Sequence, residues 1–113
     1  MELQSKTVGD ITVVSVMSDR IDAVVAIQFK DRMREIGETE SARIVLDMSQ
    51  VRFVDSSGLG SVVAALKMVG RDRTLELSGL TPTVAKVFRL TRLDSVFKIH
   101  TDLGSATDGA VFA

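Results

Sequence analysis

Residues 51–60, VRFVDSSGLG, hold the side chains whose types and spacing are best suited to chemistry. Asp55 is followed by Ser56 and Ser57, so a carboxylate stands beside two hydroxyls. A serine can act as a nucleophile when a histidine and a carboxylate assist it, and His100 is the single histidine of the chain. However, the elbow sequence G-x-S-x-G is absent, and Asp55 lies too near Ser57 in sequence to be a third triad member. We therefore expect no catalytic residue and no enzyme activity.

Binding of a nucleotide or a metal ion is also disfavoured by the spacing. Gly58 and Gly60 begin the pattern of a dinucleotide loop, but Val63 stands where its third glycine belongs, and no P-loop Lys-Ser/Thr pair follows. Asp47 and Asp55 are two carboxylates, which do not fill a coordination sphere. The chain has no cysteine, which excludes disulfides and thiolate metal sites. We expect no cofactor and no metal.

The two serines are expected at a helix start. An extended segment ends at Val54, and an apolar stripe of helical period begins at Leu59, so a helix is predicted over 58–70. Ser56 and Ser57 then lie at or just before its N-terminus, where a serine cap stabilises a helix by about 1 kcal/mol. A helix needs only one N-cap residue, so capping does not account for both serines.

The two glycines that follow favour a binding role for this helix start. In the first turn, Gly58 and Gly60 each cost about 1 kcal/mol relative to alanine. Glycines leave a bare surface over which another molecule can approach the backbone closely. A phosphoryl group on Ser57 would add about −2 charge beside Asp55, at a helix N-terminus that favours anions. We interpret this stretch as a regulated binding surface.

The rest of the chain alternates strands with helices, which predicts a single α/β domain over residues 1–113. We expect a mixed sheet of about four to five strands with about four helices packed on it. The predicted strands cover 3–8, 11–17, 43–48, 74–78 and a short segment at 96–99. The other predicted helices cover 23–36, a stretch beginning at Pro82, and 103–111. Asp22 is the expected N-cap of the first helix, Gly37 its stop, and Thr81 the N-cap before Pro82.

Composition and charge narrow the classes of partner. The chain of 113 residues has a formal net charge of −1, without the basic excess of a nucleic-acid binder. No apolar run approaches about 18 residues, so nothing is predicted to span a membrane. The first ten residues lack the basic start and apolar stretch of a signal peptide. We expect a cytoplasmic protein, a monomer or weak dimer, that binds neither nucleic acid nor membrane.

The hexapeptide 55–60, DSSGLG, resembles the signature of the STAS domain, in particular of bacterial anti-sigma factor antagonists. The resemblance covers nearly the whole chain, including ARIVLDMSQVRFVDSSGLG and the later LTPTVAKVFRLTRLDSVFKI. It implies that Ser57, the second serine of the pair, is phosphorylated by a partner kinase that is also the anti-sigma factor. It also implies that Asp22 lies near the same surface. Residues 19–22 read DRID, without the glycine that is frequent in the family at this place.

The resemblance implies a non-catalytic phospho-switch. The unphosphorylated form binds the ATP-bound anti-sigma factor serine kinase, phosphorylation of Ser57 releases it, and a phosphoserine phosphatase restores it. The expected partner-binding residues are Asp22, Asp55, Ser56, Ser57, Gly58, Leu59 and Gly60. Fold alone does not settle the partner. The alternative is a STAS scaffold or ligand-sensing module that binds a nucleotide, an anion, a stress-signalling complex or a transporter subunit and is not regulated by phosphorylation.

Overall fold

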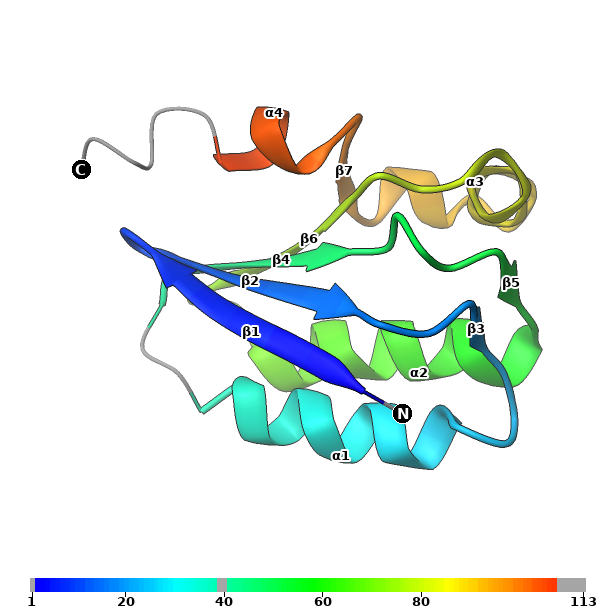
Figure 1. The fold of residues 1–113 in the computed structure, drawn as a ribbon, viewed down its shortest axis with the longest axis horizontal. Helices are drawn as coiled ribbons and strands as arrows, with labels where there is room; N and C mark the ends of the chain where they lie inside the picture. The colour runs from blue at the N-terminus through cyan, green and yellow to red at the C-terminus, as the bar shows by residue number, and fades with distance from the viewer. Residues whose placement is uncertain (1, 39–40, 108–113) are drawn as a thin grey trace.

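The computed structural model describes residues 2–38 and 41–107, and it has the predicted α/β architecture with a mixed sheet (Figure 1). Among the described residues, a five-stranded sheet has the order β1-β2-β4-β6-β7, and a two-stranded sheet joins β3 and β5. The strands are β1 (Leu3–Val8), β2 (Ile11–Val16), β3 (Arg20–Ile21), β4 (Arg43–Asp47), β5 (Phe53–Val54), β6 (Thr74–Ser78) and β7 (Lys98–His100). The helices are α1 (Ala26–Ile36), α2 (Ser56–Val69), α3 (Pro82–Leu90) and α4 (Leu103–Thr107), with a 3-10 turn η1 (Leu93–Ser95).

Strand direction follows from the connections. β1 and β2 are antiparallel and joined by a tight turn in which Gly9 has φ 60°. β2, β4, β6 and β7 are mutually parallel, because a helix crosses back between each consecutive pair. The carboxyl ends of these four strands therefore share one edge of the sheet.

The two faces of the sheet are covered unequally. Figure 1 shows α1 and α2 side by side on one face and α4 on the other. On β4, Ile44 and Leu46 point into the main core, whereas Val45 lies in a second apolar cluster with Ala106 of α4. Such a continuous apolar run is typical of a strand covered on both faces, and all three side chains are fully buried.

Several predicted boundaries shift. α1 begins at Ala26 rather than at residue 23, and α2 begins at Ser56 rather than at residue 58. The last strand is Lys98–His100, and Val96 lies outside it with 54% of its surface exposed. α4 ends at Thr107 within the described part, and residues 108–111 of that predicted helix lie outside the described residues. In the described part of the chain, no helix is long and apolar enough to cross a membrane.

Candidate functional site at the start of α2

Asp55, rather than a serine, caps α2. Its Oδ1 accepts a hydrogen bond from the Gly58 N–H at 2.8 Å, and its backbone has the extended conformation of an N-cap residue. Neither serine is needed as a cap, because the carboxylate of Asp55 satisfies the free N–H group. The other oxygen, Oδ2, accepts from the Ala23 N–H at 3.1 Å. Asp55 thus ties the start of α2 to the segment that follows β3.

Ser56 and Ser57 are consequently the first two residues of α2. Both are exposed, and neither hydroxyl has a hydrogen-bond partner among the described residues. The hydroxyl of Ser57 is therefore accessible from solvent. Its neighbour Asp55 is occupied on both oxygens by backbone N–H groups. His100 is bonded to Glu76, so Asp55, Ser57 and His100 form no hydrogen-bonded triad.

Asp22 lies beside this helix start but does not cap α1. The N-cap of α1 is Val25, whose side chain makes no cap hydrogen bond. Asp22 instead closes a turn: its Oδ1 accepts from the Val24 N–H at 3.1 Å, and its backbone carbonyl accepts from the Val25 N–H. The prediction of a cap at Asp22 is wrong because this turn precedes the helix. Asp22 is buried, and its Oδ2 lies 3.5 Å from Nη1 of Arg20.

The two glycines have different surroundings. Gly58 is buried, and a Cβ placed on it would lie 1.7 Å from the backbone oxygen of Ile21. The interpretation that Gly58 serves a partner more than the fold is therefore wrong: it permits α2 to contact β3. Gly60 is exposed, and a Cβ placed on it would meet nothing within 4 Å beyond its own helix backbone and chain neighbours, so its role in partner approach stays a prediction. Leu59 is half-buried and packs against the main core.

Exposed apolar side chains lie around this helix start, and they are not among the residues predicted from the sequence. Val24 is 83% exposed, Ile27 67% and Phe53 46%. β3 pairs with β5 so that Arg20 stands opposite Phe53, and its guanidinium lies 5.7 Å from the ring centroid. Figure 1 shows β3 and β5 at the end of the molecule where α1 and α2 begin. We call this the α2 N-terminal surface; it comprises Arg20, Asp22, Val24, Ile27, Phe53, Asp55, Ser56, Ser57 and Gly60.

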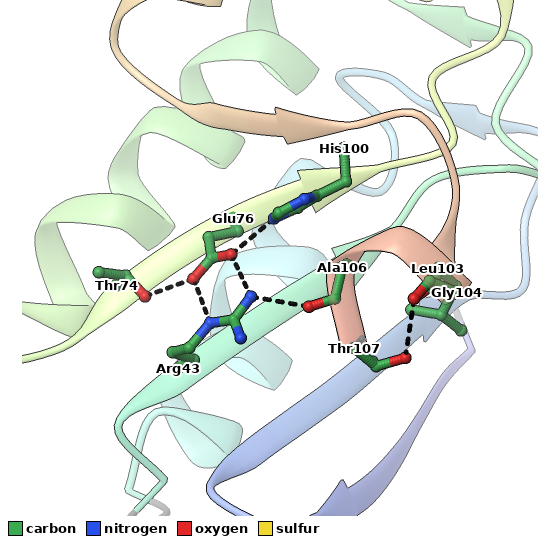
Figure 2. Close-up of polar contacts among 8 residues, drawn as sticks. All are labelled: Arg43, Thr74, Glu76, His100, Leu103, Gly104, Ala106 and Thr107. Carbon is green, nitrogen blue, oxygen red and sulfur yellow. Dashed lines mark hydrogen bonds and ion pairs between the residues drawn. The ribbon is translucent and has the colours of Figure 1, made fainter. Parts of the chain in front are cut away.

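A second polar cluster lies on the opposite face of the sheet, under α4 (Figure 2). Glu76 is only 2% exposed, yet Arg43 donates to both of its oxygens, at 2.8 and 2.6 Å. Thr74 and His100 also contact this carboxylate, each at 2.7 Å. Arg43 further donates to the Ala106 carbonyl of α4 at 2.8 Å. The cluster therefore joins three strands to α4.

The charge state of Glu76 follows from these contacts. Burial raises the pKa of Glu76, but hydrogen bonds from Arg43, Thr74 and His100, with the attraction of the Arg43 charge, outweigh burial and hold that pKa at about 2. An ionised carboxylate only accepts hydrogen bonds, so Nε2 of His100 must carry the hydrogen that points at Glu76. His100 is the last residue of β7, and its side chain is 13% exposed.

Comparison with known proteins assigns the family. A family model described as the STAS domain matches residues 2–106, and the chain belongs to this family. Its relatives include the anti-sigma-B factor antagonist of Listeria monocytogenes, 30% identical over 84 residues, which is 74% of this chain and 74% of that protein. The predicted resemblance to anti-sigma factor antagonists is thereby confirmed.

Solved structures agree with this assignment. An anti-sigma factor antagonist from Mycobacterium paratuberculosis has a TM-score of 0.85 at 25% identity, covering 96% of this chain and 92% of that chain. The Bacillus cell fate determinant SpoIIAA in its phosphorylated form has a TM-score of 0.70 at 20% identity, covering 95% of this chain and 97% of that chain. At the latter identity the likeness concerns the fold.

Proposed function

We propose that this chain is an anti-sigma factor antagonist that works as a phospho-switch at Ser57. In its unphosphorylated form it binds an ATP-bound anti-sigma factor that is also a serine kinase, and phosphorylation of Ser57 releases it. A phosphoserine phosphatase returns it to the binding form. The observation that carries the proposal is the unbonded, exposed hydroxyl of Ser57 in the first turn of a helix, within a surface that also exposes Val24, Ile27 and Phe53.

The α2 N-terminal surface suits such a switch physically. A patch of exposed apolar side chains within a polar surface is typical of a protein-binding site, because a partner that covers it removes hydrocarbon from water. A phosphoryl group on Ser57 adds about −2 charge close to the Asp55 carboxylate. A partner that covers this surface would then bury an unpaired charge, which costs several kcal/mol. The core is untouched, so the modification changes binding without unfolding the domain.

The first test is the position of the phosphate. We expect the cognate kinase with ATP to phosphorylate Ser57 and to leave Ser56 largely unmodified. Both hydroxyls are exposed at adjacent helical positions, so the specificity rests on how the partner seats against Val24, Ile27 and Phe53. Phosphopeptide mapping by mass spectrometry measures the site, with Ser57→Ala and Ser56→Ala as paired substrates. Phosphate on Ser56 with Ser57 untouched contradicts the assignment.

The second test separates charge from folding. Ser57→Asp should keep the melting temperature nearly unchanged. A negative charge at a helix N-terminus stabilises the fold by about 0.3–1 kcal/mol, and repulsion from Asp55 offsets part of this stabilisation. Its affinity for the nucleotide-bound kinase should fall at least about tenfold, whereas Ser57→Ala should bind as the wild type does. Isothermal calorimetry measures both affinities.

The matched control is Thr83→Asp, which places the same charge at the second position of α3, where Thr83 is exposed. We expect this variant to bind the kinase as the wild type does. Equal affinities of folded Ser57→Asp and Ser57→Ala would remove the switch mechanism. That result would favour the alternative, a STAS scaffold or ligand-sensing module that is not regulated by phosphorylation.

A further inference from the structure

A cavity of about 320 Å³ that is broadly open to solvent lies between α3, η1 and the end of β7. Leu80 follows β6, and His100 and Thr101 lie at the end of β7, so the cavity opens at the shared carboxyl edge of the parallel strands. Ligands of open α/β sheets bind outside this edge. No residue of the α2 N-terminal surface lines the cavity, so an inference about it stands apart from the proposed function.

Two opposite charges face this cavity without pairing. Arg89 comes from α3 and Asp94 from η1. Within the described residues, neither side chain forms an ion pair or a hydrogen bond. A guanidinium binds a carboxylate through two parallel hydrogen bonds, and a carboxylate accepts hydrogen bonds from an ammonium group. The cavity thus offers one group for each charge of a zwitterion.

The rest of the lining combines three apolar side chains with His100 and Thr101, and much of it is fixed by contacts to the fold. Leu80, Ala85 and Ile99 supply the apolar lining, and Leu80 and Ile99 also pack against the main core. Nε2 of His100 lies 2.7 Å from Oε1 of Glu76, a contact drawn as a dashed line in Figure 2. A wall fixed by packing and hydrogen bonds loses little conformational freedom when a ligand binds. The volume is near the lower end of ligand pockets, roughly 300–1,000 Å³, which suits a ligand of amino-acid size.

We propose that this cavity binds a small zwitterion with an apolar group, the chemistry of a free aliphatic α-amino acid. Its carboxylate contacts Arg89, its ammonium group contacts Asp94, and its side chain lies against Leu80, Ala85 and Ile99. Each charge of the ligand then meets a group that has no other partner among the described residues.

Three probes of one shape test the proposal: L-leucine, 4-methylpentanoate, which lacks the ammonium group, and 3-methylbutylamine, which lacks the carboxylate. Each is titrated at constant ionic strength into the ¹⁵N-labelled full chain, and the amide shifts of Ala85, Ile99, His100 and Thr101 are followed by NMR. We expect saturable shifts with L-leucine and at least tenfold weaker binding of each half-ligand.

The variants assign each charge to its residue. Arg89→Gln should weaken L-leucine at least tenfold and leave 3-methylbutylamine unchanged, whereas Asp94→Asn should weaken L-leucine and leave 4-methylpentanoate unchanged. Both residues are exposed, so both variants should fold, which thermal unfolding checks. Arg71→Gln and Asp72→Asn, in the exposed turn before β6, are the charge-matched controls and should bind as the wild type does.

Three results would overturn the proposal. One is the absence of saturable shifts at these four amides with L-leucine. Another is that 4-methylpentanoate or 3-methylbutylamine binds as tightly as L-leucine, since one charge of L-leucine would then contribute nothing to binding. The last is an equal loss of binding in the Arg71→Gln or Asp72→Asn control, which would mean general charge screening. None of these results bears on phosphorylation of Ser57.

Discussion

Gly58→Ala is expected to destabilise the domain by about 3 kcal/mol or more, the upper end of what overpacking costs. The added Cβ would lie 1.7 Å from the Ile21 carbonyl oxygen and 2.6 Å from its carbon. These are backbone atoms of β3, which cannot rotate away as a side chain can. Either α2 or β3 must therefore move, and the Asp55 contacts to Gly58 and Ala23 hold both in place.

Urea unfolding measures this loss, and Gly60→Ala is its matched control in the same turn. Nothing lies within 4 Å of a Cβ at Gly60, so alanine there should leave stability unchanged or raise it by up to about 1 kcal/mol, as the better helix former. A free energy of unfolding for Gly58→Ala within about 0.5 kcal/mol of the wild type would contradict this prediction. Weaker kinase binding by a fully stable Gly60→Ala variant would support a partner role at that position.

The sequence predicts elements well where the signal is local. The apolar run 44–46 indicated a strand covered on both faces, and it is buried on both. The stop of α1 at Gly37 and the start of α3 at Thr81 are also confirmed as cap positions. Thr81 does not cap with its side chain, however, because its Oγ1 donates to the Val51 carbonyl instead. A tertiary contact replaced the local one.

The geometry of the candidate site depends on contacts between distant residues, which local patterns do not contain. Asp55 contacts the backbone 32 residues earlier in the chain at Ala23. Ile21 belongs to a two-residue strand, which is too short to show a hydrophobic period. Because that strand is not predictable, nothing in the sequence shows that Gly58 lies against another backbone segment. The serine pair was placed correctly at a helix start, but its neighbours in space were not predictable from the residues beside it.

The sequence does contain one indication of the apolar side chains near this site. Ile27 lies outside the stripe of Ala26, Phe29 and Met33 that faces the core of α1, and it is 67% exposed. A single exposed apolar residue is ordinary, but one that lies beside other exposed apolar side chains indicates a surface that another molecule can cover. Together with Val24, it would have extended the predicted site from the start of α2 to the start of α1.

The burial of Glu76 is not indicated by the residues around it. Leu75 and Leu77 alternate with it, and such alternation is typical of a strand whose polar residues face water. The carboxylate is nevertheless buried, because α4 and β7 cover that face and Arg43, on the neighbouring strand β4, neutralises it. The pairing register, Arg43 opposite Thr74, brings the two charges together across 33 residues of sequence.

Arg43→Met is therefore expected to cost about 3–5 kcal/mol, the range for removing one partner of a buried ion pair. Methionine keeps the apolar stem of the arginine, but both Arg43 bonds to Glu76 disappear, and the bond to the Ala106 carbonyl of α4 disappears with them. Glu76 would stay buried with only Thr74 and His100 as donors. Urea unfolding at neutral pH measures the loss.

The double variant Arg43→Met/Glu76→Gln and a pH series separate the buried charge from lost packing. The double variant should be more stable than Arg43→Met, because it no longer buries an unpaired carboxylate.

In the wild type, the pKa of Glu76 is about 2 in the folded state against an ordinary 4.5. The stabilisation from this carboxylate is therefore complete above pH 4.5 and is lost as the pH falls toward 2. That loss amounts to about 3 kcal/mol. Arg43→Met should raise the pKa of Glu76 in the folded state. The stability that this variant loses between pH 4.5 and 2 should therefore be smaller than in the wild type. An equally steep acid loss in Arg43→Met, or a double variant no more stable than the single one, would mean that Arg43 acts through packing against α4 and not through its charge.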